Sequence, residues 1–268
     1  MIDYTTRFGM EENPFLKNSR EILFENPEFT EVQTRLEWFL TTKGFGILTG
    51  GSGKGKTTCV RVWLRKLNPS LYKPIYLCLS TLNVTEFYRT LADALGLEPK
   101  YRKNDNFKLI QEEIVRYSVE KRITLVIVID EANHICNAIL NDLRLLFNFE
   151  MDSRDRAIVL LTGLPSLNHT LQLGIHESLR QRVTMNYNMD GLSKDEAKAY
   201  IQTKLQGVNC IRQVFNENAL EALANAANGV PRLLSKLANR SLMIASSKGF
   251  DTIGAEIVAQ AVNDCELS

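Results

Sequence analysis

Up to residue 189, short unbroken apolar runs are separated by longer stretches in which apolar residues recur at three- and four-residue spacing. Unbroken hydrophobicity is typical of parallel strands covered on both faces, and the longer stretches are typical of amphipathic helices. Strands separated by helices imply crossover connections and a parallel sheet. The predicted strands lie at 45–48, 74–80, 125–129, 157–161 and 183–189, and the predicted helices at 28–42, 58–67, 83–95, 109–120 and 138–149.

From Asp190 onward the pattern predicts helices only. The first of them opens at Ser193, which with Glu196 three residues later has the sequence signature of a capping box. We therefore expect an α/β domain over 1–189, with a parallel sheet sandwiched by helices and an N-terminal extension, and a small all-helical domain over 190–268. The further helices of that domain are predicted at 217–227, 231–247 and 254–263.

The segment between the first predicted strand and its following helix reads GGSGKGKT, which fits the pattern G-x-x-x-x-G-K-[ST] of phosphate-binding loops. Glycines allow a tight turn whose backbone N–H groups point at one anion, and the helix start adds unpaired N–H groups and a positive dipole end. A glycine-rich turn that matches by chance is the alternative, and four fixed positions between a strand and a helix weigh against it. The residues expected to bind nucleotide here are Gly50, Gly51, Ser52, Gly53, Lys54, Gly55, Lys56, Thr57 and Thr58.

Two pairs of side chains are expected to divide the chemistry between them. Lys56 is expected to reach the β- and γ-phosphates of ATP, and the Thr57 hydroxyl to bind Mg²⁺. Asp130 and Glu131 end the third predicted strand, at the edge of the sheet where open α/β sheets bind ligands. We expect Asp130 to hold Mg²⁺ through water and Glu131 to orient and deprotonate the attacking water. Taken alone, the acidic pair also fits a strand end that begins a solvated loop, and Lys54 is either a phosphate contact or a solvated side chain.

The amino-acid composition says more about where in the cell the protein works than about the reaction it catalyses. An apolar fraction of 44% is ample for a core, and no apolar run approaches the roughly 20 residues that cross a bilayer. The N-terminus lacks a secretory signal core, and the five cysteines show no C-x-x-C spacing, so we expect reduced thiols in a cytoplasmic protein. A formal net charge of +1 excludes a globally basic nucleic-acid coat but permits a local basic stripe.

Motifs along essentially the whole chain resemble those of AAA+ ATPases, in the branch that holds the secretion ATPase ExeA and the transposition regulators TnsC, TniB and MuB. The resemblance implies an AAA+ fold with a helical lid domain and Mg²⁺-dependent ATP hydrolysis. The motifs that carry it are FGMEENPF, GGSGKGKT, VIVIDEANH, LLTGLPSL, ESLRQRV, DGLSKDEAKAYIQTKL and GVPRLLSKLANR.

The resemblance also assigns roles to three arginines. Arg232, in GVPR, looks like the sensor-2 arginine that reaches the γ-phosphate from the lid, and Pro231 before it suits a first helical turn. Arg180 and Arg182, in SLRQR, resemble the arginine-finger region, which completes the site of a neighbouring subunit in an oligomer. Either of the two is a candidate for the finger. The alternative for the other one is a structural ion pair with a carboxylate.

Other assignments from the resemblance leave alternatives open. Thr162 is the candidate for sensor 1, and Leu164 stands where ExeA-like chains tend to have a polar residue. In P-loop proteins an N-terminal segment often passes over the adenine, which makes Phe15 a candidate contact, with core packing as its alternative. His134 either responds to the nucleotide state or is an ordinary packed or partly exposed side chain.

Three functions fit an ATPase of this branch. The first is a transposition regulator that assembles with ATP into a ring or filament on double-stranded DNA and recruits or activates a transposase. The second is an ExeA-like secretion ATPase, which would add a membrane span and a wall-binding region that this sequence does not show. The third is a helicase-loader-like ATPase. We favour the first, with self-association, duplex DNA and a transposase as partners and no membrane.

A local feature supports the first function. Between residues 81 and 108, cations and aromatic residues are concentrated in a segment that such regulators use for DNA, and a few cations per subunit suffice when many subunits line one duplex. A solvated charged loop is the alternative interpretation of 98–108. The candidate DNA contacts are Thr81, Arg89, Lys100, Tyr101, Arg102, Lys103 and Lys108.

Overall fold

The computed structural model describes residues 4–78 and 82–265. The chain divides into two compact units. The first, which we call the α/β unit, comprises Phe29–Gly51 and Lys56–Met189. The second, the helical unit, comprises Met1–Glu28, Ser52–Gly55 and Asp190–Ser268.

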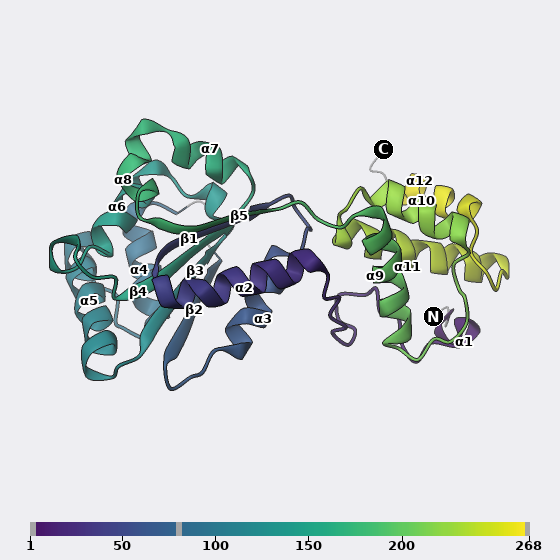
Figure 1. Ribbon diagram of the computed structural model, residues 1–268, viewed down its shortest axis with the longest axis horizontal. Helices are drawn as coiled ribbons and strands as arrows, with labels where there is room; N and C mark the ends of the chain where they lie inside the picture. Colours follow the sequence, from purple (N-terminus) through teal and green to yellow (C-terminus); the bar gives the residue numbers. More distant parts are fainter. Residues whose placement is uncertain (1–3, 79–81, 266–268) are drawn as a thin grey trace. The chain divides into compact units, whose positions relative to one another are not determined.

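The α/β unit is built on a five-stranded sheet in which every neighbouring pair is parallel. The spatial order is β2-β3-β4-β1-β5, so the strand that ends in Asp130 and the strand before GGSGKGKT (residues 50–57, here called the glycine loop) lie on either side of β4. Helices cover both faces of the sheet (Figure 1), and this confirms the predicted fold class. The strands are β1 Gly44–Gly50, β2 Tyr72–Cys78, β3 Thr124–Asp130, β4 Ala157–Gly163 and β5 Val183–Met189.

The burial of the strands explains the hydrophobic pattern of the sequence. All seven residues of β1 and of β4 are buried, as are the last six of β3, because these central strands are covered on both sides. The edge strands β2 and β5 mix buried with exposed positions. The helices of this unit are α2 Pro27–Thr42, α3 Lys56–Lys66, α4 Val84–Ala94, α5 Lys103–Val115 with a π-helical turn Arg116–Glu120, α6 Asn137–Leu146, α7 Ser166–Gln172 and α8 Glu177–Arg180.

Gly46 in β1 allows helix α2 to pack closely against the sheet. A Cβ atom at this position would lie 2.6 Å from Cε1 of Phe39 and 3.1 Å from Leu160. Phe39 itself is fully buried. The aromatic ring therefore occupies the space that any side chain at Gly46 would need.

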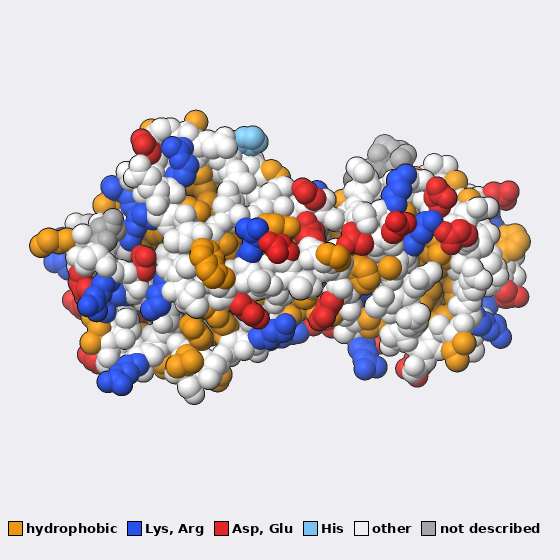
Figure 2. Space-filling view, viewed as in Figure 1, with side chains coloured by type: hydrophobic (Ala, Val, Ile, Leu, Met, Phe, Trp, Pro, Cys, Tyr) orange, Lys and Arg blue, Asp and Glu red, His pale blue; other side chains and the backbone are white. Residues whose placement is uncertain are grey.

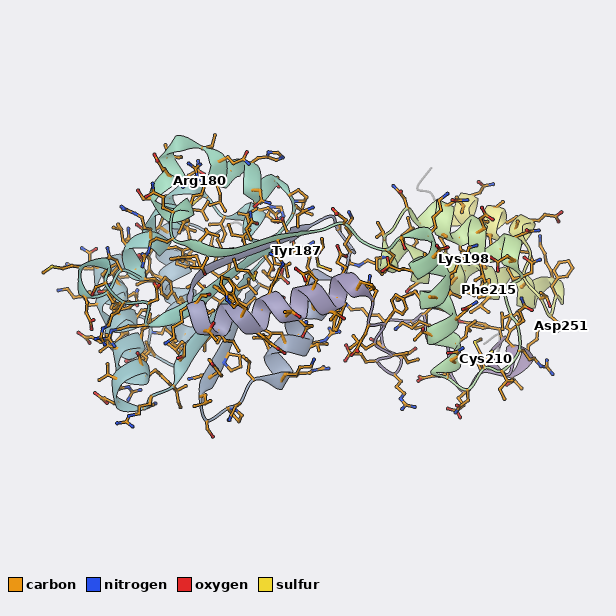
Figure 3. The ribbon with its side chains drawn as sticks, in the orientation of Figure 1. Arg180, Tyr187, Lys198, Cys210, Phe215 and Asp251 are labelled. Atoms are coloured by element: carbon orange, nitrogen blue, oxygen red, sulfur yellow. The ribbon has the colours of Figure 1, made fainter. Side chains whose placement is uncertain are left out.

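The helical unit has a core of its own. Its helices are α1 Tyr4–Phe8, α9 Lys194–Gln206, α10 Glu217–Ala227, α11 Pro231–Lys248 and α12 Ala255–Cys265. The predicted capping box is present, because the Ser193 side chain accepts from the Glu196 N–H and the Glu196 carboxylate accepts from the Ser193 N–H. Cys210 and Phe215, labelled in Figure 3, belong to this core. Burial raises the pKa of the Cys210 thiol, and all five cysteines of the chain are free.

The N-terminal segment lies with the helical unit, whereas the sequence pattern predicted it to be part of the α/β domain. The physical reason is that Phe8, Met10 and Phe15 are buried in the hydrophobic core formed by α9 to α12. The other end of the division, between Met189 and Asp190, falls where the strand pattern of the sequence gives way to helices.

Two local features differ from the sequence predictions. Helix α5 begins at Lys103 and not at residue 109, so the second half of the predicted polar loop is helical. Asn106 explains the earlier start: it is fully buried, accepts from the Lys100 N–H at 2.7 Å, and donates to the Lys100 and Arg102 carbonyls. The short helices α7 and α8 between β4 and β5 were not predicted at all.

The packing of Phe39 on Gly46 predicts the effect of one added methyl group. Gly46→Ala should lower the free energy of unfolding by about 1–3 kcal/mol, because overpacking a filled core displaces neighbours. Urea denaturation measures it. Gly174→Ala is the matched control, since a Cβ there meets nothing within 4 Å. Equal stability of the two variants would contradict the packing described.

Candidate functional site

The glycine loop joins β1 to α3 and brings the predicted nucleotide-binding residues into one turn. Gly53 and Gly55 have φ values of +77° and +100°, a backbone region that residues with side chains rarely adopt. The Gly53 position is also crowded, since a Cβ there would lie 2.9 Å from both Val230 Cγ1 and Arg232 Cβ. These glycines are therefore required by conformation and by close approach.

Lys56 opens helix α3 and folds back over the loop. Its side chain is 7% exposed, and its Nζ donates to the carbonyl oxygens of Gly50 at 2.8 Å and Gly51 at 3.0 Å. The ammonium group is thus held on the inner side of the turn. A cation in this position, beside the N-terminus of a helix, suits the binding of a phosphate.

Asp130 is the centre of a hydrogen-bond network at the carboxyl edge of the sheet. Its Oδ2 accepts from the Thr57 hydroxyl at 3.1 Å and from the Tyr76 hydroxyl at 2.6 Å. Its Oδ1 accepts from the Glu131 N–H at 3.0 Å and from the Thr162 hydroxyl. The side chain that ends β3 is therefore tied to α3, β2 and β4 at once.

The network decides the charge of Asp130. Burial by itself would raise the pKa of this carboxyl group, but the hydrogen bonds donated by Thr162, Tyr76, Glu131 N–H and Thr57 outweigh it and lower the pKa. Tyr76 responds in the opposite sense, because burial and its hydrogen bond to the carboxylate raise its pKa. The pair therefore consists of an ionised carboxylate and a protonated phenol at neutral pH.

The oxygen atoms at this point fit a magnesium ion. Thr57 and Asp130 present a hydroxyl and a carboxylate, the hard oxygen ligands that Mg²⁺ prefers, and they lie within hydrogen-bond distance of one another beside the loop. No cluster of three or more His, Cys, Asp or Glu side chains with metal-binding geometry occurs among residues 4–78 and 82–265. His134 is exposed and has no such neighbours.

Glu131 differs from Asp130 in its surroundings. It is exposed and has left-handed backbone angles of φ 55° and ψ 36°, which end the strand abruptly. The turn that follows is fixed by Asn133, whose Oδ1 accepts from the Leu164 N–H at 2.9 Å. A carboxylate that is solvent-accessible at the end of the sheet is available to a water molecule, whereas the neighbouring aspartate is fully engaged.

Polar residues that the sequence analysis missed join the same edge of the sheet. Asn168 in α7 donates to the hydroxyl of Thr49 at 2.9 Å, and that hydroxyl donates to Asn188 in β5 at 3.1 Å. Tyr76 and Asn133 were missed too. Nothing in the local sequence marks them, because each contacts a partner at least 31 positions away.

The two candidate finger arginines have different environments. Arg180 on α8 is exposed, and it donates to the last-turn carbonyls of α7, Gln172 at 3.0 Å and Leu171 at 3.5 Å (Figure 3). The Arg182 side chain is only 14% exposed. It donates to the carbonyls of Arg144 and Phe147 and pairs with Asp155 at 3.3 Å.

The contacts of Arg182 indicate that its role is structural. Its guanidinium group satisfies carbonyls at the end of α6 and also lies 5.5 Å from the centre of the Phe45 ring. Arg180, by contrast, offers an accessible guanidinium group. The structure therefore favours Arg180 as the candidate that contacts another molecule.

The remaining candidates for nucleotide contacts lie in the helical unit. Arg232 is exposed in the first turn of α11, and its N–H donates to the Gly53 carbonyl at 3.3 Å. Lys54 is half-buried and contributes a favourable charge near Glu28, whose carboxylate accepts from the N–H groups of Asp190 and Gly191. Phe15 is 7% exposed and packs in the core of this unit, which favours the packing alternative for it.

The candidate DNA contacts are only partly available. Arg89, Arg102 and Lys108 are exposed on α4 and around the start of α5, and Lys100 is exposed beside Glu98 at 3.3 Å. Lys103 is paired with Asp142 at 2.5 Å and lies over the Tyr88 ring, so it is the least available of the set. Thr81 lies outside the described residues.

The sequence of this chain is similar to those of several known proteins. Residues 40–171 match the AAA domain family. General secretion pathway protein A of Aeromonas hydrophila is 31% identical over 92% of this chain, which spans only 45% of that protein. ATP-dependent target DNA activator B of Escherichia phage D108 is 26% identical over 91% of this chain and 75% of its own length.

Solved structures agree on the fold. Cdc6p from Pyrobaculum aerophilum has a TM-score of 0.73 at 17% identity, over 95% of this chain and 72% of that one. The RuvB branch migration motor of Thermotoga maritima has a TM-score of 0.59 at 17% identity, over 96% of this chain and 74% of that one. Within the described part of the chain, no helix combines the length and apolar character that a bilayer crossing requires.

Because Arg180 and Arg182 differ in burial, their substitution by alanine should lower the free energy of unfolding by different amounts. Arg182→Ala should lower the free energy of unfolding by about 1–3 kcal/mol, because it leaves two partly buried carbonyls and Asp155 without their donor. Arg180→Ala, the matched control, should change it by less than about 0.5 kcal/mol, as is usual for an exposed side chain. Chemical denaturation of both variants tests this, and a larger loss for Arg180→Ala would refute the assignment.

Proposed function

Because this chain is an AAA+ protein, similar along its length to members of the branch that holds ExeA and MuB, we propose that it is an ATPase that regulates DNA transposition. In this proposal it binds ATP with Mg²⁺ at the glycine loop and oligomerises on duplex DNA. The ATP-bound oligomer then directs target selection or activates a transposase in the cytoplasm.

The hydrogen bond between Thr57 and Asp130 is the observation that carries the ATPase part. It places the hydroxyl of the glycine loop and the acid of a separate strand at one point, as binding of a metal–nucleotide complex requires. Mg²⁺, when bound there, would neutralise charge on the β- and γ-phosphates. Lys56 would exchange its carbonyl partners for phosphate oxygens, and the loop N–H groups would hold the remaining charge.

Glu131 is the residue we assign as general base. Its exposed carboxylate is able to accept a proton from a water molecule, while Asp130 keeps its own carboxylate turned to Thr57. Thr162 acts in the proposal through Asp130, to whose Oδ1 it donates. Arg232 would contact the γ-phosphate from the helical unit, and Arg180 would complete the site of a neighbouring subunit.

The similarity to target DNA activator B is the observation that favours DNA transposition. It extends over 91% of this chain and 75% of that protein, so both units are included in the match. The local support is the group of exposed cations around α4 and the start of α5, namely Arg89, Lys100, Arg102 and Lys108. Acidic and basic side chains are interspersed on the face shown in Figure 2, so DNA binding would depend on a few cations repeated in each subunit.

A second candidate function rests on the similarity to general secretion pathway protein A. The identity is higher, 31%, although the chain spans less than half of that protein. In this alternative the ATPase would serve a secretion system and would not assemble on DNA. Electron microscopy of the protein with duplex DNA and a slowly hydrolysed ATP analogue separates the two, because rings or filaments on DNA are expected only of the transposition regulator.

Substitution of the proposed base should separate binding from hydrolysis. Glu131→Gln should bind ATP as tightly as the wild type and hydrolyse it about 10²–10⁴ times more slowly, the usual contribution of a general base. Lys56→Ala should abolish binding, and Glu120→Gln, which changes an exposed carboxylate at the end of the π-helical turn before β3, should change neither. Isothermal titration and phosphate release measure the two steps. Turnover of Glu131→Gln at the wild-type rate would exclude Glu131 as the base.

Charge reversal should test the DNA contacts. Changing Arg89, Lys100 and Arg102 to Glu should weaken duplex binding and reduce the log–log salt slope by about 0.9 for each phosphate that is no longer neutralised. The control reverses three exposed cations outside this segment, Lys17, Arg20 and Lys66, so the change in net charge is equal. Fluorescence anisotropy over a salt series gives the slopes. Equal slopes for the two triple variants would place the DNA contacts elsewhere.

A further inference from the structure

The Asp130 carboxylate accepts from four donors in the described part of the chain. Two meet each oxygen: Thr162 and the Glu131 N–H at Oδ1, and Thr57 and Tyr76 at Oδ2. An ionised carboxylate offers about four lone-pair sites. A water molecule bound to Mg²⁺ would also need one of these sites, so one donor has to give way.

Three of the donors are poorly placed to leave. The Glu131 N–H is fixed by the backbone of the residue next to Asp130. Thr162 is 1% exposed in the central strand β4. Thr57 belongs to the first turn of α3 and is itself the expected metal ligand, so its hydroxyl remains at the site when a metal binds.

Tyr76 is different in each of these respects. It lies on β2, an edge strand of the sheet, and is 45% exposed. Its hydroxyl is at the end of a long side chain, so a small rotation of the ring breaks the 2.6 Å hydrogen bond without moving the backbone. Because Tyr76 is 45% exposed, its hydroxyl is able to turn to solvent when it departs, whereas a donor in the core would be left unpaired.

We propose that Tyr76 is a positioning residue that occupies the site on Asp130 Oδ2 needed by a magnesium-bound water, and that it sets the Mg²⁺ concentration at which the protein binds nucleotide. While the site lacks a metal, the hydroxyl keeps the buried carboxylate satisfied and turned toward Thr57. Binding of a metal would then require the Tyr76 hydroxyl to leave Asp130 Oδ2. This inference rests on the proposed magnesium site at Thr57 and Asp130.

The test is Tyr76→Phe, which removes only the hydroxyl group. The affinity for a slowly hydrolysed ATP analogue is titrated against Mg²⁺, and Mn²⁺ binding to the protein–analogue complex is followed by electron paramagnetic resonance. The half-saturating metal concentration should fall by about tenfold, a change commonly associated with one hydrogen bond to a charged group. Tyr72→Phe, at the start of the same strand, is the matched control and should stay within about twofold of the wild type.

Two other results would contradict the inference, and they differ in whether the proposed function is contradicted as well. If the wild type responds to the metal and Tyr76→Phe responds equally, or needs more metal, the competition is excluded and the proposed function stands. If the wild type binds the analogue with no dependence on Mg²⁺ or Mn²⁺, the magnesium site itself is wrong, and the inference is overturned with it. A purely structural hydroxyl would lower the unfolding midpoint of Tyr76→Phe without changing the metal dependence.

Discussion

The burial of Asp130 is the constraint on which the candidate site depends. A carboxylate that is 4% exposed is tolerated only if its oxygen atoms are paired, and the chain supplies donors from α3, β2, β4 and the next peptide group. Each donor comes from a different part of the fold, so the ionised state of one side chain requires the sheet order to be correct. One of these contacts, donated by Thr57, also connects the carboxylate to the glycine loop beside it.

Local patterns allowed the elements of the site to be predicted from the sequence. The glycine loop, the strand that ends in Asp130 and the Ser193 capping box are each contained in fewer than ten consecutive residues, so their chemistry is visible without the fold. The unbroken apolar runs predicted a parallel sheet because the three central strands are buried on both faces. The start of α5 could not be predicted in this way, since the side chain of Asn106 organises the preceding backbone.

Long-range partners account for what the sequence could not show. Tyr76 reads as one more residue of a β-strand, and only the register of β2 against β3 brings its hydroxyl to Asp130. The arginines at 180 and 182 are equivalent as letters in the motif SLRQR. Packing distinguishes them, because one meets the carbonyls at the end of α6 and the other remains exposed.

Helix α7 shows how these separate contacts are combined. Its approach is held by Asn133, in the turn after the acidic pair, and its first turn is held by Asn168 on Thr49, directly before the glycine loop. Its last carbonyls hold Arg180. Through α7, hydrogen bonds therefore link the strand end at Thr49 and the turn after the acidic pair to Arg180.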